Sequence, residues 1–164
     1  HSVQIVEQNF IMNMKKLFTL CLISLMALSA SAQQMEFVDL GLPSGTFWKA
    51  VNEPGLYTYD EAMSKYNSQI PTNIQLEELR KECVWTWNGT GYHVTGPNGN
   101  FITLPASGHY NCNNGDLLYL GLGGYYWSST ATDYDAASYI FFDASKVSVY
   151  EVNRCNSFSV RLVR

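Results

Sequence analysis

The chain has 164 residues, of which 14% are aromatic and 15% are charged, and its formal net charge is −4. The basic residues do not cluster, which argues against nucleic acid or an anionic membrane surface as a partner. Plentiful aromatic and sparse charged residues are typical of a β-rich core with uncharged polar loops.

The N-terminal part of the chain has the pattern of an export signal. Residues 1–13 show no periodicity and are interpreted as an unstructured upstream extension. Residues 14–32 follow with two lysines, an apolar run over 17–28 and small residues before a cleavage point, as in a signal peptide. The apolar run is shorter than the about 20 residues of a membrane span. A buried core helix is the alternative interpretation of this run.

Residues 33–164 are therefore expected to be the mature protein, folded as a single domain. Cleavage would remove two of the ten basic and one of the fourteen acidic residues, which leaves a net charge of 8 − 13 = −5. We expect this domain to reach the periplasm, the cell surface or the extracellular medium, and to have no membrane span.

The first part of the mature chain is predicted to contain a strand and a helix. Residues 36–42 alternate in polarity as a short half-buried strand does. Thr58 and Glu61 have the spacing of a capping box, in which each side chain bonds the backbone of the other residue. The helix that begins there is expected to run to about Tyr66.

A second helix is predicted to follow directly. Thr72 and Gln75 repeat the capping-box spacing. Leu76, Leu79 and Cys83 then occur at i, i+3 and i+7, so they lie on one stripe of the helix that should face the core.

The rest of the chain is predicted to consist of strands and loops, arranged around a β-hairpin at residues 92–107. The arms of this hairpin alternate with period two, Gly96-Pro97-Asn98-Gly99 has the composition of a turn, and Pro105 should end the second arm. Residues 108–124 show no usable period and are interpreted as a long, partly packed loop. Further strands are predicted at residues 84–87, 125–129, 137–142, 147–152 and 158–163.

Five segments occur in a characteristic order: VDLGLPSGTFW (38–48), IPTNIQLEELRKECVWTW (70–87), VTGPNGNFITLPASG (94–108), GGYYWSST (123–130) and RCNSFSVRLVR (154–164). Together they resemble the Fibrobacter succinogenes major paralogous domain, a family found in exported proteins of Bacteroides-like bacteria. The chain departs from the family pattern at Ser157, where Gly is usual, and at Leu162, where Cys is frequent. The family's longer insert before the second helix is also compact here.

The resemblance implies an α+β, C-type lectin-like fold with two short helices, two small antiparallel sheets and paired terminal strands. Residues 36–42 are then expected to pair with, or lie beside, residues 158–163. Residues 108–124 would take the place of the ligand-binding loop region of that fold.

No metal site or cofactor is expected. Gly96-Pro97-Asn98 is similar to the Glu-Pro-Asn sugar motif of calcium-dependent lectins, but Gly96 replaces the carboxylate. Trp127-Ser128-Ser129 stands where such lectins have Trp-Asn-Asp. Calcium needs several oxygen ligands, usually with more than one carboxylate, so a structural turn is the expected role of Gly96-Pro97-Asn98.

Three cysteines remain in the mature domain, and export permits a disulfide. Cys83 lies in an apolar run and is expected to be a small buried residue. Cys112 and Cys155 both lie in loops that contain asparagine, so a bridge between them and a pair of free thiols are open alternatives.

No catalytic constellation is apparent, and the protein is not expected to be an enzyme. His93 on a strand and His109 in a loop have no nucleophile or ligand pattern beside them. Asp133 and Asp135 flank Tyr134 in a loop, a spacing that indicates no catalytic pair. Arg161 on the closing strand is expected to pair with a buried carboxylate or a backbone carbonyl.

The leading hypothesis is an exported, non-enzymatic module that binds a glycan or a protein through a face made of three loops, at residues 108–124, 130–136 and 153–157. The alternative is that these three loops are only solvent-exposed connections and bind no ligand. Two other functions compete with this hypothesis. One is a structural subunit of a surface fibre or assembly. The other is an oxidase-like enzyme that is related to formylglycine-generating enzymes and uses Cys112 and Cys155. The candidate ligand contacts are Tyr110, Asn111, Asn113, Asp116, Asp133, Tyr134 and Arg154.

Overall fold

The computed structural model describes Met14, Lys16 and residues 36–164. The chain divides into two compact units, His1–Glu36 and Phe37–Arg164, and the fold below is that of the second unit. The predicted upstream extension and signal peptide lie outside the described residues, apart from Met14 and Lys16. Among the residues that are described, no helix is long and apolar enough to cross a membrane.

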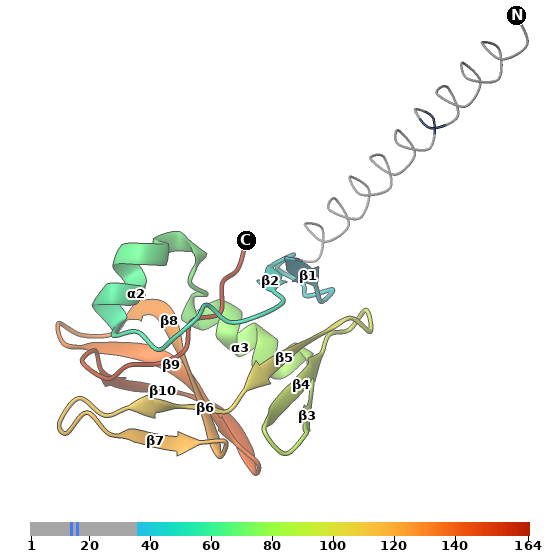
Figure 1. The fold of residues 1–164 in the computed structure, drawn as a ribbon. Helices are drawn as coiled ribbons and strands as arrows, with labels where there is room; N and C mark the ends of the chain where they lie inside the picture. The colour runs from blue at the N-terminus through green and yellow to red at the C-terminus, as the bar shows by residue number, and fades with distance from the viewer. Residues whose placement is uncertain (1–13, 15, 17–35) are drawn as a thin grey trace, which may run out of the picture. The chain divides into compact units, whose positions relative to one another are not determined.

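The unit is a mixed α+β fold with two short α-helices and three small sheets (Figure 1). The sheets have the strand orders β1-β2, β3-β4-β5 and β10-β9-β8-β6-β7. The helical elements are α2 (Tyr59–Tyr66), the 3-10 helix η1 (Asn67–Gln69) and α3 (Asn73–Glu82). The strands are β1 (Phe37–Asp39), β2 (Phe47–Lys49), β3 (Val84–Trp87), β4 (Gly91–Thr95), β5 (Phe101–Pro105), β6 (Ser107–Tyr110), β7 (Leu117–Leu120), β8 (Gly123–Ala131), β9 (Ala136–Asp143) and β10 (Lys146–Asn153).

Both predicted helices are confirmed, and so are their capping boxes. The Thr58 hydroxyl accepts from the Glu61 amide at 3.4 Å, and the Glu61 carboxylate accepts from the Thr58 amide at 2.9 Å. Thr72 and Gln75 make the same reciprocal pair at the start of α3. α3 buries its predicted stripe and contacts β8, β9 and β10.

The predicted central hairpin is β4 with β5, and its tip packs against the segment after β1. Gly96 accepts from the Gly99 amide at 3.0 Å, and Gly99 has a φ of 86°, which glycine adopts without strain. A Cβ at Gly96 would lie 2.0 Å from the Leu40 carbonyl oxygen. The Asn98 side chain donates to the Asp39 carbonyl at 2.9 Å. The segment therefore has the structural role that the sequence predicted for it.

The interpretation of residues 108–124 as an irregular loop is wrong. This stretch contains most of β6, all of β7 and the start of β8, and His109 lies on a strand. β6 pairs antiparallel with β7, as Figure 1 shows. Gly108 has a φ of 65° and Tyr119 a φ of 58°, so neither strand keeps the regular backbone that gives an alternating pattern.

The chain ends of the unit pair, but not through the strand that was predicted. β2, rather than residues 36–42, bonds to the C-terminus: the Phe47 amide donates to the Arg164 carbonyl, and the Arg164 amide to the Phe47 carbonyl, both at 3.0 Å. Trp48 lies opposite Val163 in this pairing. β1 pairs with β2 on its other side, so residues 36–42 lie one strand away from the closing segment.

The closing segment is also not the alternating, half-buried strand that was predicted. Every residue from Phe158 to Val163 is buried, and the segment makes isolated bridges rather than a ladder. Val163 packs in one hydrophobic cluster with Trp48, whereas Phe158 packs in a second cluster with Trp127. Because both of its sides are covered by protein, no polar face remains on this segment.

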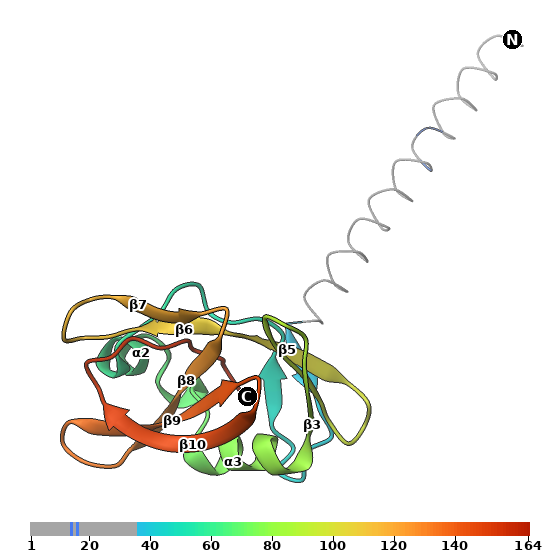
Figure 2. The ribbon, with the colours of Figure 1, turned by 90° about the horizontal axis from the view of Figure 1, so that it is seen from below.

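The two clusters use opposite faces of the five-stranded sheet. Tyr126 and Phe142 face the first cluster, which also receives α3, and their neighbours Tyr125 and Trp127 face the second, which also receives α2. Figure 2 shows the five-stranded sheet with the curved β9–β10 hairpin on one side of β8 and β6–β7 on the other.

Candidate functional site

Three turns from distant parts of the sequence meet at one end of the domain. They are residues 111–116 between β6 and β7, residues 132–135 between β8 and β9, and residues 154–157 after β10. Cys112 and Cys155 form a disulfide, which resolves the alternatives left open by the sequence in favour of a bridge. The Arg154 amide donates to the Asp135 carbonyl at 2.8 Å, so the second and third turns are also joined.

A cavity of about 440 Å³ lies where the last two of these turns approach α2. The start of α2 is part of its wall because the Tyr59 amide donates to the Arg154 carbonyl at 3.1 Å. We call this cavity the loop pocket. Its lining residues are Thr58, Asp60, Tyr134, Asp135, Asn153, Arg154 and Cys155.

Arg154 is the best-fixed charged side chain of the loop pocket. Its guanidinium lies over the Tyr59 ring at 4.4 Å, and its Nη1 donates to the Tyr134 carbonyl at 3.1 Å. The same nitrogen lies 3.9 Å from the Asp60 carboxylate. The Nε atom of Arg154 is buried and has no hydrogen-bond partner in the structure. Stacking and one hydrogen bond to a backbone carbonyl thus hold the guanidinium in place, and some of its N–H groups remain without an acceptor.

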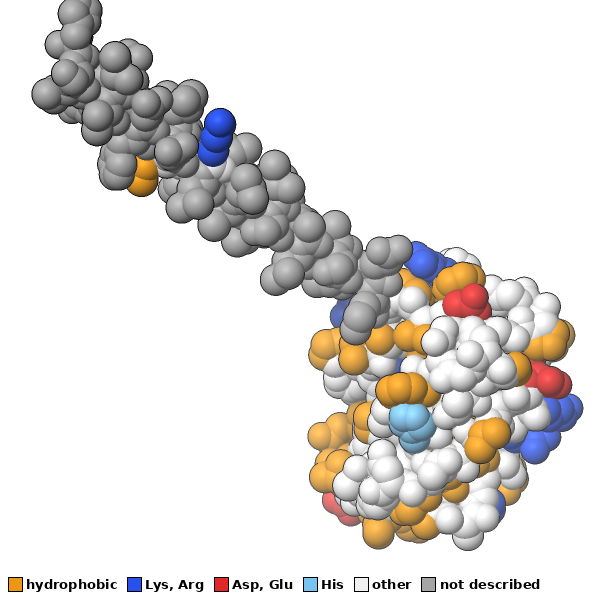
Figure 3. Space-filling view, turned by 90° about the vertical axis from the view of Figure 1, so that its right-hand side faces the viewer, with side chains coloured by type: hydrophobic (Ala, Val, Ile, Leu, Met, Phe, Trp, Pro, Cys, Tyr) orange, Lys and Arg blue, Asp and Glu red, His pale blue; other side chains and the backbone are white. Residues whose placement is uncertain are grey.

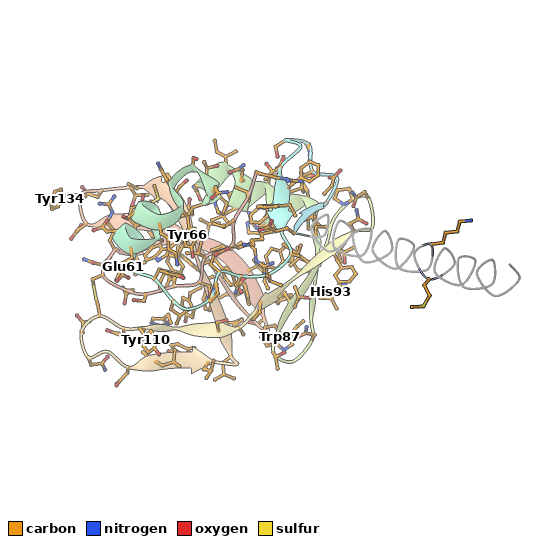
Figure 4. All side chains as sticks on the ribbon, turned by 45° about the horizontal axis from the view of Figure 1, so that its top comes forward. Glu61, Tyr66, Trp87, His93, Tyr110 and Tyr134 are labelled. Carbon is orange, nitrogen blue, oxygen red and sulfur yellow. A yellow bond between two sulfur atoms is a disulfide. The ribbon has the colours of Figure 1, made fainter. Side chains whose placement is uncertain are left out.

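The remaining lining residues combine acceptors, a donor and an aromatic ring. The Asp60 carboxylate is exposed at the first turn of α2. Asp135 accepts from the Asn153 side-chain amide at 3.4 Å and keeps further acceptor capacity. Tyr134 is 93% exposed, and Figure 4 shows it pointing away from the body of the domain. The loop pocket can therefore donate, accept and stack against a ligand at the same time.

A family model described as a domain of unknown function (DUF8237) matches residues 70–163. The chain belongs to this family. No curated protein and no solved structure matches the chain. The DUF8237 match begins after α2, so it includes Tyr134, Asp135 and Arg154 of the loop pocket but not Thr58 and Asp60.

The structure places two of the seven predicted contact residues, Tyr134 and Arg154, in the loop pocket. Asp133 is next to it, and its carboxylate accepts from the Tyr134 amide at 2.7 Å. Tyr110 is 43% exposed on β6 and does not line the pocket; its backbone pairs with that of Ser157.

The other three predicted residues belong to the turn between β6 and β7, and they mostly make hydrogen bonds within that turn. The Asn111 side chain accepts from the Asn113 amide at 2.8 Å, and the Asp116 carboxylate accepts from the Asn114 side chain at 2.7 Å. They share the disulfide-linked end of the domain with the loop pocket, but they do not line it.

The sequence predicted one face from the loops that contain Asp135, Asn153 and Cys155, but it did not indicate that Thr58 and Asp60 belong to it. The capping box located the start of α2, and therefore the positions of Thr58 and Asp60 along that helix. No sequence signal placed that helix beside the turn after β10, because the contact joins segments about a hundred residues apart.

The two histidines of the described residues have structural surroundings. His109 packs between the rings of Tyr125 and Phe158, at centroid distances of 4.3 and 5.6 Å, and burial lowers its pKa. His93 lies against the Phe101 ring at 3.9 Å. Figure 3 shows a histidine among apolar and uncharged side chains on one face of the molecule. Over residues 36–164, no group of three His, Cys, Asp or Glu side chains is arranged to hold a metal ion.

Proposed function

We propose that this protein is an exported, non-enzymatic binding module that holds a glycan in the loop pocket. The observation that carries the proposal is the combination, in one cavity, of a fixed guanidinium, two carboxylates, an amide and an exposed tyrosine ring. Neighbouring sugar hydroxyls each donate and accept, so a site that offers both kinds of group beside a stacking ring suits them. The volume of about 440 Å³ lies in the ordinary range of small-ligand sites.

Preorganisation supports the same proposal. The Arg154 backbone is bonded on both sides, to Tyr59 and to Asp135, and its guanidinium is stacked before any ligand arrives. A cation that is already ordered loses little conformational entropy on binding. The ligand-facing groups therefore sit on a scaffold that two helices and three sheets hold in place.

We also propose the finer fold assignment, C-type lectin-like, and kinship with the Fibrobacter succinogenes major paralogous domain. Two early capped helices, a late run of strands and chain ends that pair through β2 and Arg164 support it. Export is part of this proposal and is supported by the residue pattern at positions 14–32. The Cys112–Cys155 bridge fits an oxidising compartment.

The competing functions have less support. A surface fibre needs two different patches that fit each other, so that copies join without closing. The large exposed apolar side chains of the described residues are spread over several elements, among them Ile74 on α3, Val84 on β3 and Phe101 on β5. An oxidase-like enzyme would need an activated thiol. Here Cys112 and Cys155 are bonded to each other, and the side chain that contacts the Cys112 backbone is the neutral amide of Asn156, at 3.4 Å.

Binding to a panel of immobilised glycans tests the proposal, with two tyrosine variants as a matched pair. Tyr134→Ala removes the ring in the loop pocket, and Tyr110→Ala removes a ring that is 43% exposed on β6 outside it. We expect Tyr134→Ala to weaken capture at least tenfold and Tyr110→Ala to change it less than twofold. A wild-type protein that captures no glycan, or equal losses in both variants, would contradict the proposal.

A further inference from the structure

One face of the five-stranded sheet carries a row of aromatic rings to which every strand contributes. The five strands lie side by side in the order β10-β9-β8-β6-β7 (Figure 1). Neighbouring rings along the row have centroid distances of 4.3 to 6.3 Å. We call this row the aromatic face. Its members are Tyr119 on β7, His109 on β6, Tyr125 on β8, Tyr139 and Phe141 on β9, and Tyr150 on β10.

The aromatic face is open to solvent at both ends. Tyr119 and Tyr150 are 57% and 42% exposed, and Tyr139 and Phe141 between them are half-buried. Tyr125, in the middle of the row, belongs to the second hydrophobic cluster, so the row rests on the core of the domain. A ligand that lies across the row therefore meets rings that are already ordered, which lowers the entropic cost of binding.

The tyrosine hydroxyls of the aromatic face are unbonded. Over residues 36–164, none of these four hydroxyls makes a hydrogen bond to another protein group. In the core, by contrast, Tyr59, Tyr92 and Tyr126 each donate to a backbone carbonyl, at 2.7 to 2.9 Å. Because a buried tyrosine usually finds a partner for its hydroxyl, the unbonded hydroxyls are available to a ligand that carries hydrogen-bonding groups.

Tyr119 has a backbone conformation that bulky side chains rarely adopt. Its φ is 58°, in the left-handed region. Its ring lies nearly parallel to that of His109, with an interplanar angle of 16° and a centroid distance of 6.0 Å. Residues held in such conformations concentrate at functional sites, where the surrounding structure maintains them. The position of the Tyr119 ring is therefore better explained by contact with a ligand than by stability.

The charges beside the aromatic face cancel. The Lys146 ammonium lies 5.2 Å from the ring centroid of Phe141 and 5.7 Å from that of Tyr150. In the same turn, the Asp143 carboxylate accepts from the Lys146 amide at 3.1 Å, so one anion accompanies the one cation. Burial lowers the pKa of His109, which leaves its ring uncharged at neutral pH. A nucleic acid also stacks on aromatic rings, but it needs several cations along its phosphates. The charge pattern therefore fits an uncharged ligand.

We propose that the aromatic face binds an extended, uncharged polysaccharide. Sugar rings present flat C–H surfaces that stack on aromatic rings, and their hydroxyls both donate to and accept from tyrosine hydroxyls. Neighbouring strands lie about 4.8 Å apart, so a row across five strands spans roughly 19 Å. This length exceeds one sugar ring, so the ligand is a chain of several sugars that lies across the strands.

The aromatic face is a site separate from the loop pocket, because no residue belongs to both. This inference therefore does not rest on the proposed function. The loop pocket can bind a small glycan while the aromatic face binds no polymer, and the reverse also holds.

Native affinity electrophoresis through gels that contain hydroxyethylcellulose, dextran or mannan tests the aromatic face. We expect at least one of these uncharged polymers to retard the wild type. Tyr119→Asn/Tyr150→Thr should bind that polymer at least about tenfold more weakly, because two stacking rings are lost. Asparagine adopts a positive φ readily and threonine suits a strand, so the variant keeps its backbone conformation.

Two single variants are matched controls for the loss of an exposed ring. Phe101→Thr removes a ring that is 53% exposed on β5, in a different sheet, and Tyr134→Ala removes the ring of the loop pocket. Each should change the affinity for the polymer less than twofold. Far-UV circular dichroism establishes that each variant is folded.

Three outcomes would overturn the proposal. The first is a wild type that none of the three polymers retards, or that only poly-L-proline retards, since the rings would then serve a peptide. The second is unchanged retardation of the double variant. The third is a loss of polymer binding in Tyr134→Ala alone, which would assign the polymer to the loop pocket and so support the proposed function while removing this one.

Discussion

Arg161 is the one charged side chain that is buried among the described residues, and it links three parts of the chain. Its guanidinium donates to the Lys49 carbonyl at 2.7 Å, to the Thr103 carbonyl at 2.6 Å and to the Asn52 side chain at 2.8 Å. The sequence prediction of a backbone carbonyl partner is confirmed. Burial lowers the pKa of Arg161 to about 10, so the side chain is still a cation at neutral pH.

Arg161→Met should lower the free energy of unfolding by about 3 kcal/mol or more, because it leaves buried acceptors without a donor. Arg80→Met is the matched control: Arg80 makes a partly exposed ion pair with Glu77 at 2.9 Å, and such pairs contribute at most about 1 kcal/mol. Urea unfolding of both variants measures the difference. A loss below about 1 kcal/mol at Arg161 would show that water replaces its bonds.

His109 should make the domain less stable as the pH falls. Burial lowers the pKa of His109 in the folded state, so the unfolded chain takes up a proton first. Stability is then complete above the unfolded pKa of about 6.5 and decreases below it. We expect His109→Gln to remove part of the loss of unfolding free energy between pH 7.5 and pH 5.5. Equal pH dependence in wild type and His109→Gln would contradict this.

At the level of the elements, local signals predicted best. Both capping boxes and the β4–β5 hairpin depend on residues within a few positions of each other, and all three were confirmed. The β6–β7 hairpin was missed because the positive φ at Gly108 and Tyr119 breaks its alternation. The partner of the C-terminus was also missed, since β1 and β2 are both short and only tertiary packing selects β2.

The Cys112–Cys155 bridge should stabilise the domain substantially, because it closes a loop between residues 43 positions apart. Chain-entropy arguments give about 4 kcal/mol for a loop of this length, and native strain reduces that value. We therefore expect Cys112→Ser/Cys155→Ser to lower the free energy of unfolding by about 2 to 4 kcal/mol.

Cys83 should not interfere with this comparison. It is buried, and burial raises the pKa of its thiol to about 11, so it reacts slowly at neutral pH. Urea unfolding, with a thiol count on the folded protein before denaturant is added, makes the measurement. Reactive thiols at both positions 112 and 155 in the untreated protein, or an unchanged stability, would contradict the bridge.

In the domain as a whole, the hydrophobic interior and the candidate site lie in different places. Two hydrophobic clusters, on opposite faces of the five-stranded sheet, receive the two helices and the closing segment. The loop pocket lies at the ends of β8, β9 and β10, where turns meet the start of α2. The sequence predicted loops at residues 130–136 and 153–157 and named Tyr134 and Arg154 in them, and both line the loop pocket. That they contact a ligand stays a prediction. The sequence did not predict the contribution of α2, because that contact depends on how the whole chain folds.

Chemical-shift mapping tests the proposal that a glycan binds in the loop pocket. The glycan captured most strongly from the panel is titrated into ¹⁵N-labelled protein, and the backbone amides that shift are assigned. We expect the largest shifts at Asp60, Tyr134, Asp135, Asn153 and Arg154, which line the pocket. Saturable shifts centred instead on β7 or on the β3-β4-β5 sheet, with the loop-pocket amides unmoved, would contradict it.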